Sequence, residues 1–394
     1  MSRDNRFFYL CSINSKQYEQ AINQQLHIGA ATNKVLSVIS ALRSNDCQAY
    51  AVTLPVLGLT CDTKSVKRLL LRENKNPVIF LPVVSNPILR RLLGSLYFAG
   101  FCWLSVKFQD RVLLYNYSPE YLPALLILKL KGNPAILDIE DAPHHKAIGL
   151  REIINKLTYK LSLTLCRNFY ITVSMQVANN FNFKRFCVVY GAVANIAPKT
   201  IHDTSEINLL RILYGGTLCN DTGLQLFCDT IEHLLNTTNL DTKKIVFVVT
   251  GFGGEEKLNQ LHSIISNKNI EIELKSNLSF DAYQAVFKTC QAALCLKMPN
   301  SEMGATTFPS KVVDITSAGL LLISTKVSDI PVLFNNDNAL LLDEATPDKL
   351  CEALVWAIHN QEECKARAIR GQERAMELFS EYNVGKKIKE FIFQ

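Results

Sequence analysis

The sequence predicts an α/β protein built from two doubly wound, Rossmann-like domains that face a cleft. Short apolar segments suited to buried parallel strands alternate with amphipathic segments along both halves of the chain. A length of 394 residues suggests two domains of ordinary size, and a hydrophobic content of 48% is enough for two cores. Because only 20% of the residues are charged and no low-complexity segment is present, the composition excludes a disordered chain.

A polar stretch at residues 195–208, which contains Pro198, has the composition of a linker. We therefore predict a first domain at residues 1–195 and a second domain at residues 196–379. The apolar segment 384–393 is predicted to be a helix that returns to the first domain, so that residues 380–394 complete it.

In the first domain, apolar runs predict strands and the amphipathic segments between them predict helices. One strand is predicted to begin at Ala135, and the others lie at residues 7–13, 49–55, 77–84, 111–115, 169–174 and 186–190. The segment 64–72 is basic and is predicted to be an exposed helix or loop. Helices are predicted at residues 34–42, 120–131 and 151–166.

The second domain shows the same alternation. Its predicted strands lie at residues 209–214, 245–250, 270–274, 292–296 and 320–325. Its predicted helices include residues 280–289, 348–360 and 362–378, and Gly319 is predicted to end a short helix. Two successive βα-alternating halves are typical of paired doubly wound domains.

Basic residues concentrate in the first half of the chain. Residues 1–200 hold 24 Lys and Arg against 11 Asp and Glu, whereas the remaining residues hold 18 against 25, which gives a net charge of +6. Such a distribution suits contact with an anionic membrane surface or an anionic acceptor. Nucleic acid is not an expected partner, because the Lys and Arg are scattered and no nucleic-acid-binding motif is present.

The longest apolar stretch, residues 92–106, follows Arg90 and Arg91 and is too short for a membrane-spanning helix, which needs about 20 residues. The first apolar run, residues 7–11, is too short for the core of a signal peptide. Residues 87–98 therefore have two interpretations. They form an amphipathic helix that lies on acidic lipid, or a helix that packs beneath the cleft.

The 12 cysteines are predicted to be reduced core residues. They form no CxxC pair, and most lie in apolar segments, such as Cys102 and Cys295. This spacing predicts no zinc site, and no spaced ligand pattern surrounds the adjacent His144 and His145. Such cysteine usage is typical of a cytoplasmic protein.

Residues 302–331 carry the clearest functional signal, a loop followed by a short helix and a buried strand. Pro309 suits a helix start, Ser310 can cap it, and Lys311 adds a positive charge at the same place. The first N–H groups of the helix and the positive end of its dipole then face the loop, so this corner suits a phosphate or diphosphate. Asp314 follows one turn later on the same helix surface.

The chain contains Pro309-Ser310-Lys311-Val312-Val313-Asp314, followed by Ser317-Ala318-Gly319 and an apolar strand. This stretch resembles the donor-site signature of retaining nucleotide-sugar glycosyltransferases of family 4 (glycosyl transferases group 1). In that family a carboxylate at the position of Asp314 holds the ribose of the nucleotide, and the preceding loop and helix start hold diphosphate and sugar. The commoner pattern has two Glu eight positions apart. Here Asp314 replaces the second, and Thr306 stands in place of the first.

The resemblance covers nearly all of the chain, is most specific in residues 215–319, and implies the GT-B arrangement of two Rossmann-like domains. Gly215, Gly216 and Thr217 match the first loop of the donor-binding domain. The commoner form of this loop has Arg at the position of Thr217 and Lys at that of Thr222, so phosphate binding is expected to depend on backbone N–H groups and Lys311.

Two further turns of the second domain also match. Gly251 belongs to the turn after the second predicted strand, and residues 275–278 stand where the family holds the nucleotide base by main-chain contacts. The resemblance therefore adds Lys275, Asn277 and Leu278 to the expected donor-binding residues.

In the first domain, the resemblance implies an acceptor side. Gly29 and Ala30 correspond to the N-terminal glycine loop, although an ordinary βα turn explains them equally well. Glu140 and Asp141 stand where the family often has a His-Asp pair, and the alternative for them is a helix cap or a salt-bridged surface. His144, together with Glu302 of the second domain, completes the expected acceptor side.

The resemblance implies hexosyl transfer from a nucleoside-diphosphate sugar to a glycan or lipid-linked acceptor, with retention of configuration, in surface polysaccharide biosynthesis. The expected catalytic residues are Lys311, Glu140 and Asp141, with Lys311 neutralising the leaving diphosphate. No metal or other cofactor is expected, and the expected location is the cytoplasm, including the inner face of the membrane. A nucleotide-sugar epimerase of the same fold remains an alternative. So does an inactive binding subunit, which the missing cations at Thr217 and Thr222 suggest.

Overall fold

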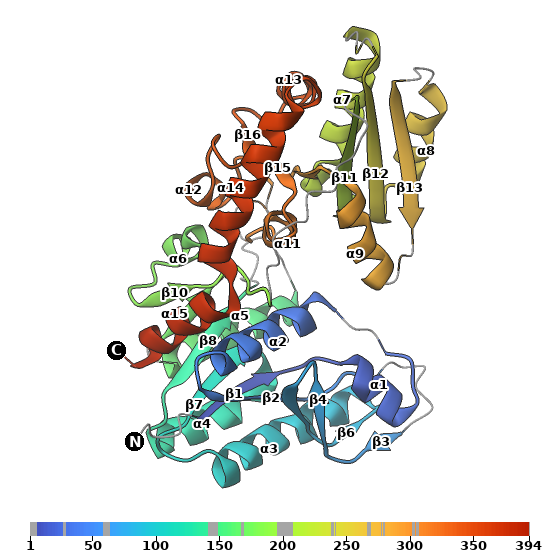
Figure 1. The fold of residues 1–394 in the computed structure, drawn as a ribbon. Coiled ribbons are helices and arrows are strands. Elements are labelled where there is room, and N and C mark those ends of the chain that lie inside the picture. Colours follow the sequence, from blue (N-terminus) through green and yellow to red (C-terminus); the bar gives the residue numbers. More distant parts are fainter. Residues whose placement is uncertain are drawn as a thin grey trace. The chain divides into compact units, whose positions relative to one another are not determined.

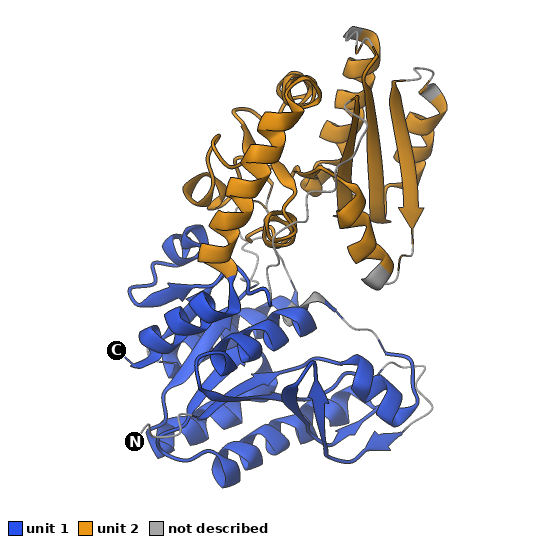
Figure 2. Cartoon of the chain, in the orientation of Figure 1, with its two compact units in different colours: residues 1–194, 380–394 blue, residues 195–379 orange. Residues whose placement is uncertain are grey.

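The computed structural model describes residues 6–26, 29–57, 64–140, 149–166, 169–194, 208–237, 240, 242–265, 269–276, 278, 280–301, 304 and 307–393. Contacts divide the chain into two compact units, shown in Figure 2. Unit 1 comprises residues 1–194 and 380–394, and unit 2 comprises residues 195–379. Each unit has its own hydrophobic core.

Unit 1 is built on an eight-stranded sheet in the order β10-β9-β8-β7-β1-β2-β5-β4. All neighbouring strands pair in parallel except β4 and β5. The strands are β1 (Arg6–Cys11), β2 (Gln48–Thr53), β4 (Leu69–Glu73), β5 (Asn76–Phe80), β7 (Arg111–Tyr115), β8 (Ala135–Ile139), β9 (Tyr170–Thr172) and β10 (Phe186–Val188). A short separate pair consists of β3 (Ser65–Val66) and β6 (Val83–Val84).

Helices cover both faces of this sheet (Figure 1). They are α1 (Lys16–Ile22), α2 (Ala30–Arg43), α3 (Pro87–Ser105), α4 (Leu122–Lys131), α5 (Leu150–Leu165), α6 (Met175–Asn180) and α15 (Glu381–Phe393). Helix α2 packs on α15, whereas α3 packs on α4 and α4 packs on α5. Connections between parallel strands are right-handed, and the chain moves from β1 to β2 in one direction but from β7 to β10 in the other. Helices α2 and α15 therefore cover one face, and α3, α4 and α5 cover the other.

Helix α15 is fastened to α2 by side chains and by close backbone approach. Asn45 Nδ2 donates to the Tyr382 carbonyl oxygen at 2.9 Å, and Lys389 Nζ donates to the Asn45 carbonyl oxygen at 2.9 Å. A Cβ at Gly385 would collide with the carbonyl group of Ala41, so only glycine allows this contact.

The interpretation of residues 64–72 as an exposed helix or loop is wrong. Strand β4 begins at Leu69 and forms an antiparallel hairpin with β5. Asn74 and Lys75 at the turn have φ angles of 47° and 70°, the left-handed pair that a tight hairpin requires. Half-buried and exposed side chains alternate from Leu69 to Arg72, and this period of two identifies a strand despite the basic composition.

Unit 2 contains a six-stranded, fully parallel sheet in the order β13-β12-β11-β14-β15-β16. The strands are β11 (Leu209–Thr217), β12 (Lys244–Phe252), β13 (Ile270–Ser276), β14 (Ala292–Cys295), β15 (Leu321–Thr325) and β16 (Leu340–Leu342). The helices of this unit include α7 (Leu224–Thr237), α8 (Glu255–Ile264), α9 (Phe280–Thr289), α11 (Lys311–Ser317), α12 (Ile330–Leu333), α13 (Pro347–His359) and α14 (Gln361–Phe379). Helix α13 packs on α7, and α14 packs on α11.

The predicted α/β class with doubly wound parallel sheets is confirmed in both units. Gly319 has a φ of 70° after α11, in agreement with its predicted role as a helix stop. Of the 11 cysteines that the structure describes, none forms a disulfide, and ten are buried. Among the described residues, no helix combines the length and apolarity needed to cross a bilayer.

Candidate functional site

The carboxyl ends of β11 and β12 approach each other through glycine. Gly216 pairs with Gly251 in register, and their φ angles are 105° and 123°. A Cβ on Gly251 would collide with the Gly216 carbonyl group, so side chains are excluded from this place. In doubly wound sheets, ligands bind beyond the carboxyl ends of the strands. The two glycines therefore leave backbone open to a ligand at this edge.

Lys311, the first residue of α11, reaches this strand end. A Cβ on Gly216 would collide with Cε and Nζ of Lys311, which places the ammonium group over the Gly216 backbone. Burial lowers the pKa of Lys311, while the neighbouring thiols of Cys295 and Cys219 favour its charged form. Among the described residues Lys311 has no carboxylate partner in an ion pair. Its charge is thus available to a bound anion.

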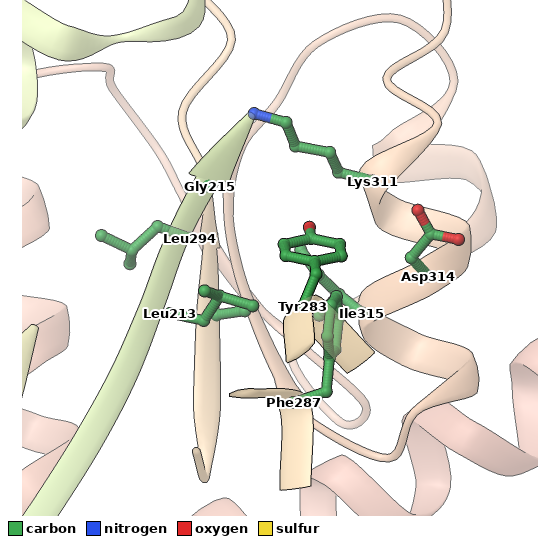
Figure 3. A pocket seen from close by; sticks show the side chains of 9 residues that line it. Leu213, Gly215, Tyr283, Phe287, Leu294, Lys311, Asp314 and Ile315 are labelled. Carbon is green, nitrogen blue, oxygen red and sulfur yellow. The ribbon is translucent and has the colours of Figure 1, made fainter. Parts of the chain in front are cut away.

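A small pocket with a cavity volume of about 10 Å³ lies beside this corner. Strands β11 and β14 contribute Leu213, Gly215 and Leu294, and helix α9 contributes Tyr283 and Phe287. Figure 3 shows Lys311 extending from α11 toward the strand that carries Gly215, with the Tyr283 ring between that strand and α11. A volume of this size holds about one water molecule. The pocket is therefore the floor of a binding surface and does not by itself enclose a nucleotide.

Asp314 and Tyr283 give the pocket its polar groups. Asp314 is an exposed residue of α11, yet the protein around its carboxylate raises its pKa to about 6. Burial, reinforced by the charge of Asp314, raises the pKa of Tyr283 to about 12. Lys311 and Asp314 lie one turn apart but form no ion pair with each other, so each keeps its own hydrogen-bonding capacity.

The start of α11 differs from the sequence-based prediction. Ser310 has helical backbone angles, φ −54° and ψ −26°, and its side chain makes no capping hydrogen bond. The expectation that Ser310 caps the helix is therefore wrong. The N–H groups of Val312 and Val313 instead donate to the carbonyl oxygens of Pro309 and Ser310, each at 3.0 Å. The charge at this corner comes from the Lys311 side chain.

The loop after β11 is held by a hydroxyl group where the commoner sequence pattern has cations. Thr222 Oγ1 donates to the Thr217 carbonyl oxygen at 2.6 Å and accepts from the Cys219 N–H at 3.1 Å. Gly223 follows with a φ of 86°, and a Cβ there would collide with the Leu296 carbonyl group. The loop is therefore a tight turn that rests on the segment after β14.

Lys297, in that segment, is a second cation near the corner, and the sequence interpretation missed it. It is 7% exposed, and its ammonium group donates to Thr307 Oγ1. Burial raises the pKa of the Cys295 thiol, while the charges of Lys311 and Lys297 lower it, which places both cations near this thiol. A lysine directly after an apolar strand of a parallel sheet was the available signal.

The remaining donor-side predictions have mixed placements. Gly215, Gly216, Thr217 and Gly251 lie together at the ends of β11 and β12. Lys275 lies at the end of β13, where its ammonium group pairs with Glu273 at 3.2 Å. Leu278 is half-buried, Pro309 is buried just before α11, and Asn277 lies outside the described residues.

In unit 1, Gly29 is the residue before α2, and Ala30 is the first residue of that helix. Glu140 follows β8, where its N–H donates to Asn116 Oδ1 at 2.8 Å. Asn116 in turn donates its N–H to the Asp138 carbonyl oxygen at 2.7 Å and has a φ of 53°. Asp141, His144 and Glu302 lie outside the described residues.

A buried polar cluster lies beneath Glu140. Asp138 is fully buried, and the Tyr9 hydroxyl group donates to its carboxylate. Burial raises the pKa of Asp138, and the charge of Lys34 opposes this shift. Lys34 Nζ donates to the Val189 carbonyl oxygen at 2.9 Å. These contacts tie β1, α2 and β8 together at the carboxyl edge of the sheet.

Comparison with known proteins adds independent evidence. Residues 210–360 match the family described as glycosyl transferases group 1. No curated protein sequence gives a match. Among solved structures, HepE of Anabaena in complex with UDP is similar with a TM-score of 0.64 and 12% identity, over 98% of this chain and 99% of that chain. TarM has a TM-score of 0.67 at 9% identity, over 100% and 99% of the two chains. Sucrose-phosphate synthase of Thermosynechococcus elongatus has a TM-score of 0.66 at 10% identity, over 99% of both chains. At these identities the likeness shows a shared fold.

Proposed function

We propose that the chain transfers a hexose from a nucleoside-diphosphate sugar to a glycan or lipid-linked acceptor. The premise is that residues 210–360 belong to the glycosyl transferases group 1 and that the chain has the GT-B fold. The transfer retains the anomeric configuration and serves surface polysaccharide biosynthesis. It takes place in the cytoplasm or at the inner face of the membrane. The UDP bound in the HepE structure supports a nucleoside diphosphate as the donor's leaving group.

The observation that carries this proposal is the position of the Lys311 ammonium group over the backbone of Gly216. A cation that has no carboxylate partner among the described residues, placed at the carboxyl edge of a parallel sheet, suits a diphosphate. Its lowered pKa reflects a poorly solvated environment, in which its attraction for an anion exceeds that in water.

Each polar group of the corner then has a role in the reaction. Charge develops on the diphosphate as the bond to the sugar breaks, and Lys311 stabilises that charge. Asp314, one turn further on, accepts hydrogen bonds from the ribose hydroxyl groups. Lys297 holds the adjoining segment through Thr307 and adds positive potential to the corner.

The acceptor side is proposed to lie in unit 1. Glu140, held by Asn116 at the carboxyl edge of its sheet, and the neighbouring Asp141 face the acceptor hydroxyl or the transferred sugar. Gly29, Ala30 and His144 of unit 1, together with Glu302 of unit 2, are proposed to border the acceptor. We further propose that no metal takes part, with Lys311 supplying the positive charge that the leaving group needs.

A donor panel tests the proposal. The purified protein is incubated with UDP-glucose and other nucleotide sugars, and ¹H NMR follows free sugar, epimerised donor and the anomeric configuration of any product. Slow release of free sugar with retained configuration supports a retaining transferase. Interconversion of donors indicates an epimerase, and tight nucleotide binding without any turnover indicates an inactive binding subunit. Absence of nucleotide binding would overturn the assignment of the Lys311 corner.

A further inference from the structure

One face of unit 1 exposes many large apolar side chains. Helix α3 buries Gly94, Phe98, Ala99, Phe101 and Cys102 against the core, which is the face that a packing helix needs. Its opposite side is also apolar, and Ile88, Leu92, Leu96 and Trp103 are 60–71% exposed. Apolar side chains at four-residue spacing on the solvent side indicate a second contact surface.

Helices α4 and α5 extend this surface. On α4 the exposed apolar residues are Leu126 and Leu130, four positions apart, and on α5 they include Ile153, Leu157 and Leu161, again four apart. Because α4 packs on both α3 and α5, the three stripes lie on the same side of the sheet. More than half of the large apolar side chains found exposed in the described chain belong to this region. We call it the α3–α5 face, with the members Ile88, Leu89, Leu92, Leu96, Trp103, Leu104, Phe108, Leu126, Leu130, Ile153, Ile154, Leu157 and Leu161.

The ends of α3 and α4 are locked together, so part of this surface is preorganised. Lys131 Nζ donates to the carbonyl oxygens of Cys102, Trp103 and Val106, which closes the carboxyl end of α3. The Phe108 ring lies against Gly132, just after α4. Leu104 and Leu130, each 83% exposed, therefore project from neighbouring helix ends beside Phe108, which is 71% exposed.

The charges around these side chains are mainly positive, and the half-buried Glu152 in the first turn of α5 is the acidic exception. Within residues 87–131 the acidic residues are Asp110 and Glu120, and both are buried. Exposed basic residues of the same region are Arg91, Lys107 and Lys129, and Lys160 is exposed on α5. A surface that combines protruding apolar groups with positive charge is complementary to an anionic lipid bilayer.

We infer that the α3–α5 face docks onto an anionic bilayer, with its apolar side chains inserted at the level of the head groups and its lysines and Arg91 against lipid phosphates. A second copy of the chain is a poorer occupant, because a two-fold dimer through this face would press two positive surfaces together. The inference rests on unit 1 alone and does not depend on the proposed sugar transfer.

Arg90 is not part of this contact, although its place before the apolar stretch suggested so. Its guanidinium group donates to the Pro55 carbonyl oxygen at 3.0 Å and to Ser12 Oγ at 2.7 Å. Exchange of Arg90 would therefore disturb the fold and cannot test lipid binding. Arg91 is the suitable position, because its side chain is 68% exposed and forms a loose ion pair with Glu120, at 3.7 Å.

Vesicle flotation tests the inference with the full chain. Vesicles of phosphatidylcholine alone are compared with an equimolar mixture of phosphatidylcholine and phosphatidylglycerol, at low and high salt. We expect binding to the anionic vesicles, weakened by salt because the charges are exposed. Leu96→Glu combined with Leu130→Glu should reduce the partition coefficient by about tenfold or more. Val332→Glu, at a 72% exposed apolar position of unit 2, is the matched control and should leave it unchanged.

Tryptophan fluorescence provides a second readout. Trp103 and Trp356 are the two tryptophans of the chain, so Trp356→Phe leaves Trp103 as the sole reporter. Its emission should shift to the blue on addition of anionic vesicles and not of neutral ones. Wild-type protein that stays unbound at low salt, or binds both kinds of vesicle equally, overturns the inference. A stable dimer that Leu96→Glu with Leu130→Glu dissolves, without any vesicle binding, would identify a second copy as the occupant instead.

Discussion

Replacement of Lys311 by methionine should separate the charge at the strand end from its packing. Methionine keeps an unbranched apolar stem over Gly216 and removes only the ammonium group. Loss of one preorganised charge contact to a developing anion costs about 2–4 kcal/mol of transition-state stabilisation, or about 30-fold to 1,000-fold in turnover. Because Lys311 has no carboxylate partner among the described residues and its pKa is lowered by burial, we expect the upper half of this range.

The assay is the initial rate of release of the nucleoside diphosphate, combined with thermal unfolding. The unfolding temperature of Lys311→Met should not fall, since a buried ammonium group without an anion costs stability rather than providing it. Lys326→Ala is the control, because this lysine of unit 2 pairs with exposed Asp343 and lies outside the pocket. Folded Lys311→Met protein with turnover within about threefold of wild type would remove Lys311 from the reaction.

Four further predictions concern the same corner and the reaction proposed there. Asp314 has a pKa raised to about 6, so the KM for the donor should rise as the pH falls through 6 and the carboxylate is protonated. Asp314→Glu should still bind the donor. A KM that does not change with pH would refute the role of Asp314 in holding the ribose. The protein around the Asp314 carboxylate disfavours its charged form, so Asp314→Asn should raise the unfolding temperature more at pH 8 than at pH 5 while weakening donor binding. Gly216→Ala should displace the Lys311 ammonium group and strain a backbone φ of 105°, which should reduce turnover and lower the free energy of unfolding in urea by about 1–3 kcal/mol. Gly100→Ala in α3 is the control: no packing neighbour lies within 4 Å of the added Cβ, so it should stabilise the protein by up to about 1 kcal/mol. Turnover should persist after exhaustive treatment with EDTA, and its loss, restored by added Mg²⁺, would refute a metal-independent reaction.

The central strands of this chain were predictable because strands buried in a parallel sheet have sequences that are mostly apolar. Strands such as β12 and β15 are buried along almost their whole length, and they contain continuous apolar runs at residues 245–249 and 321–323. The β4–β5 hairpin was missed because β4 lies at the sheet edge, where half-buried and exposed residues alternate, and the signal lay in its turn, at Asn74 and Lys75.

The site was predictable where sequence neighbours are also neighbours in space. Lys311 and Asp314 lie one turn apart on α11, so a single motif contains both. Tyr283 and Lys297 belong to other elements, and only the fold brings them to the pocket or to the corner. For Arg90 the charge is evident from the sequence, but its partners are not. The structure shows that the Arg90 guanidinium group donates to the carbonyl oxygens of Pro55 and Leu54, which are distant from it in the sequence.

The threonines at positions 217 and 222 bear on whether the chain is a transferase or an inactive binding subunit. Their lack of charge suggested an inactive binding subunit, but Thr222 holds the loop through its hydroxyl group. The Met298 N–H donates to the Asp221 carbonyl oxygen at 2.9 Å, which fastens the loop to the segment that contains Lys297. Lys311 and Lys297 supply positive charge to this corner, and both lie near the end of β14. Since a developing negative charge is stabilised by the position of nearby cations and not by the loop that carries them, the missing cations alone give no ground for inactivity.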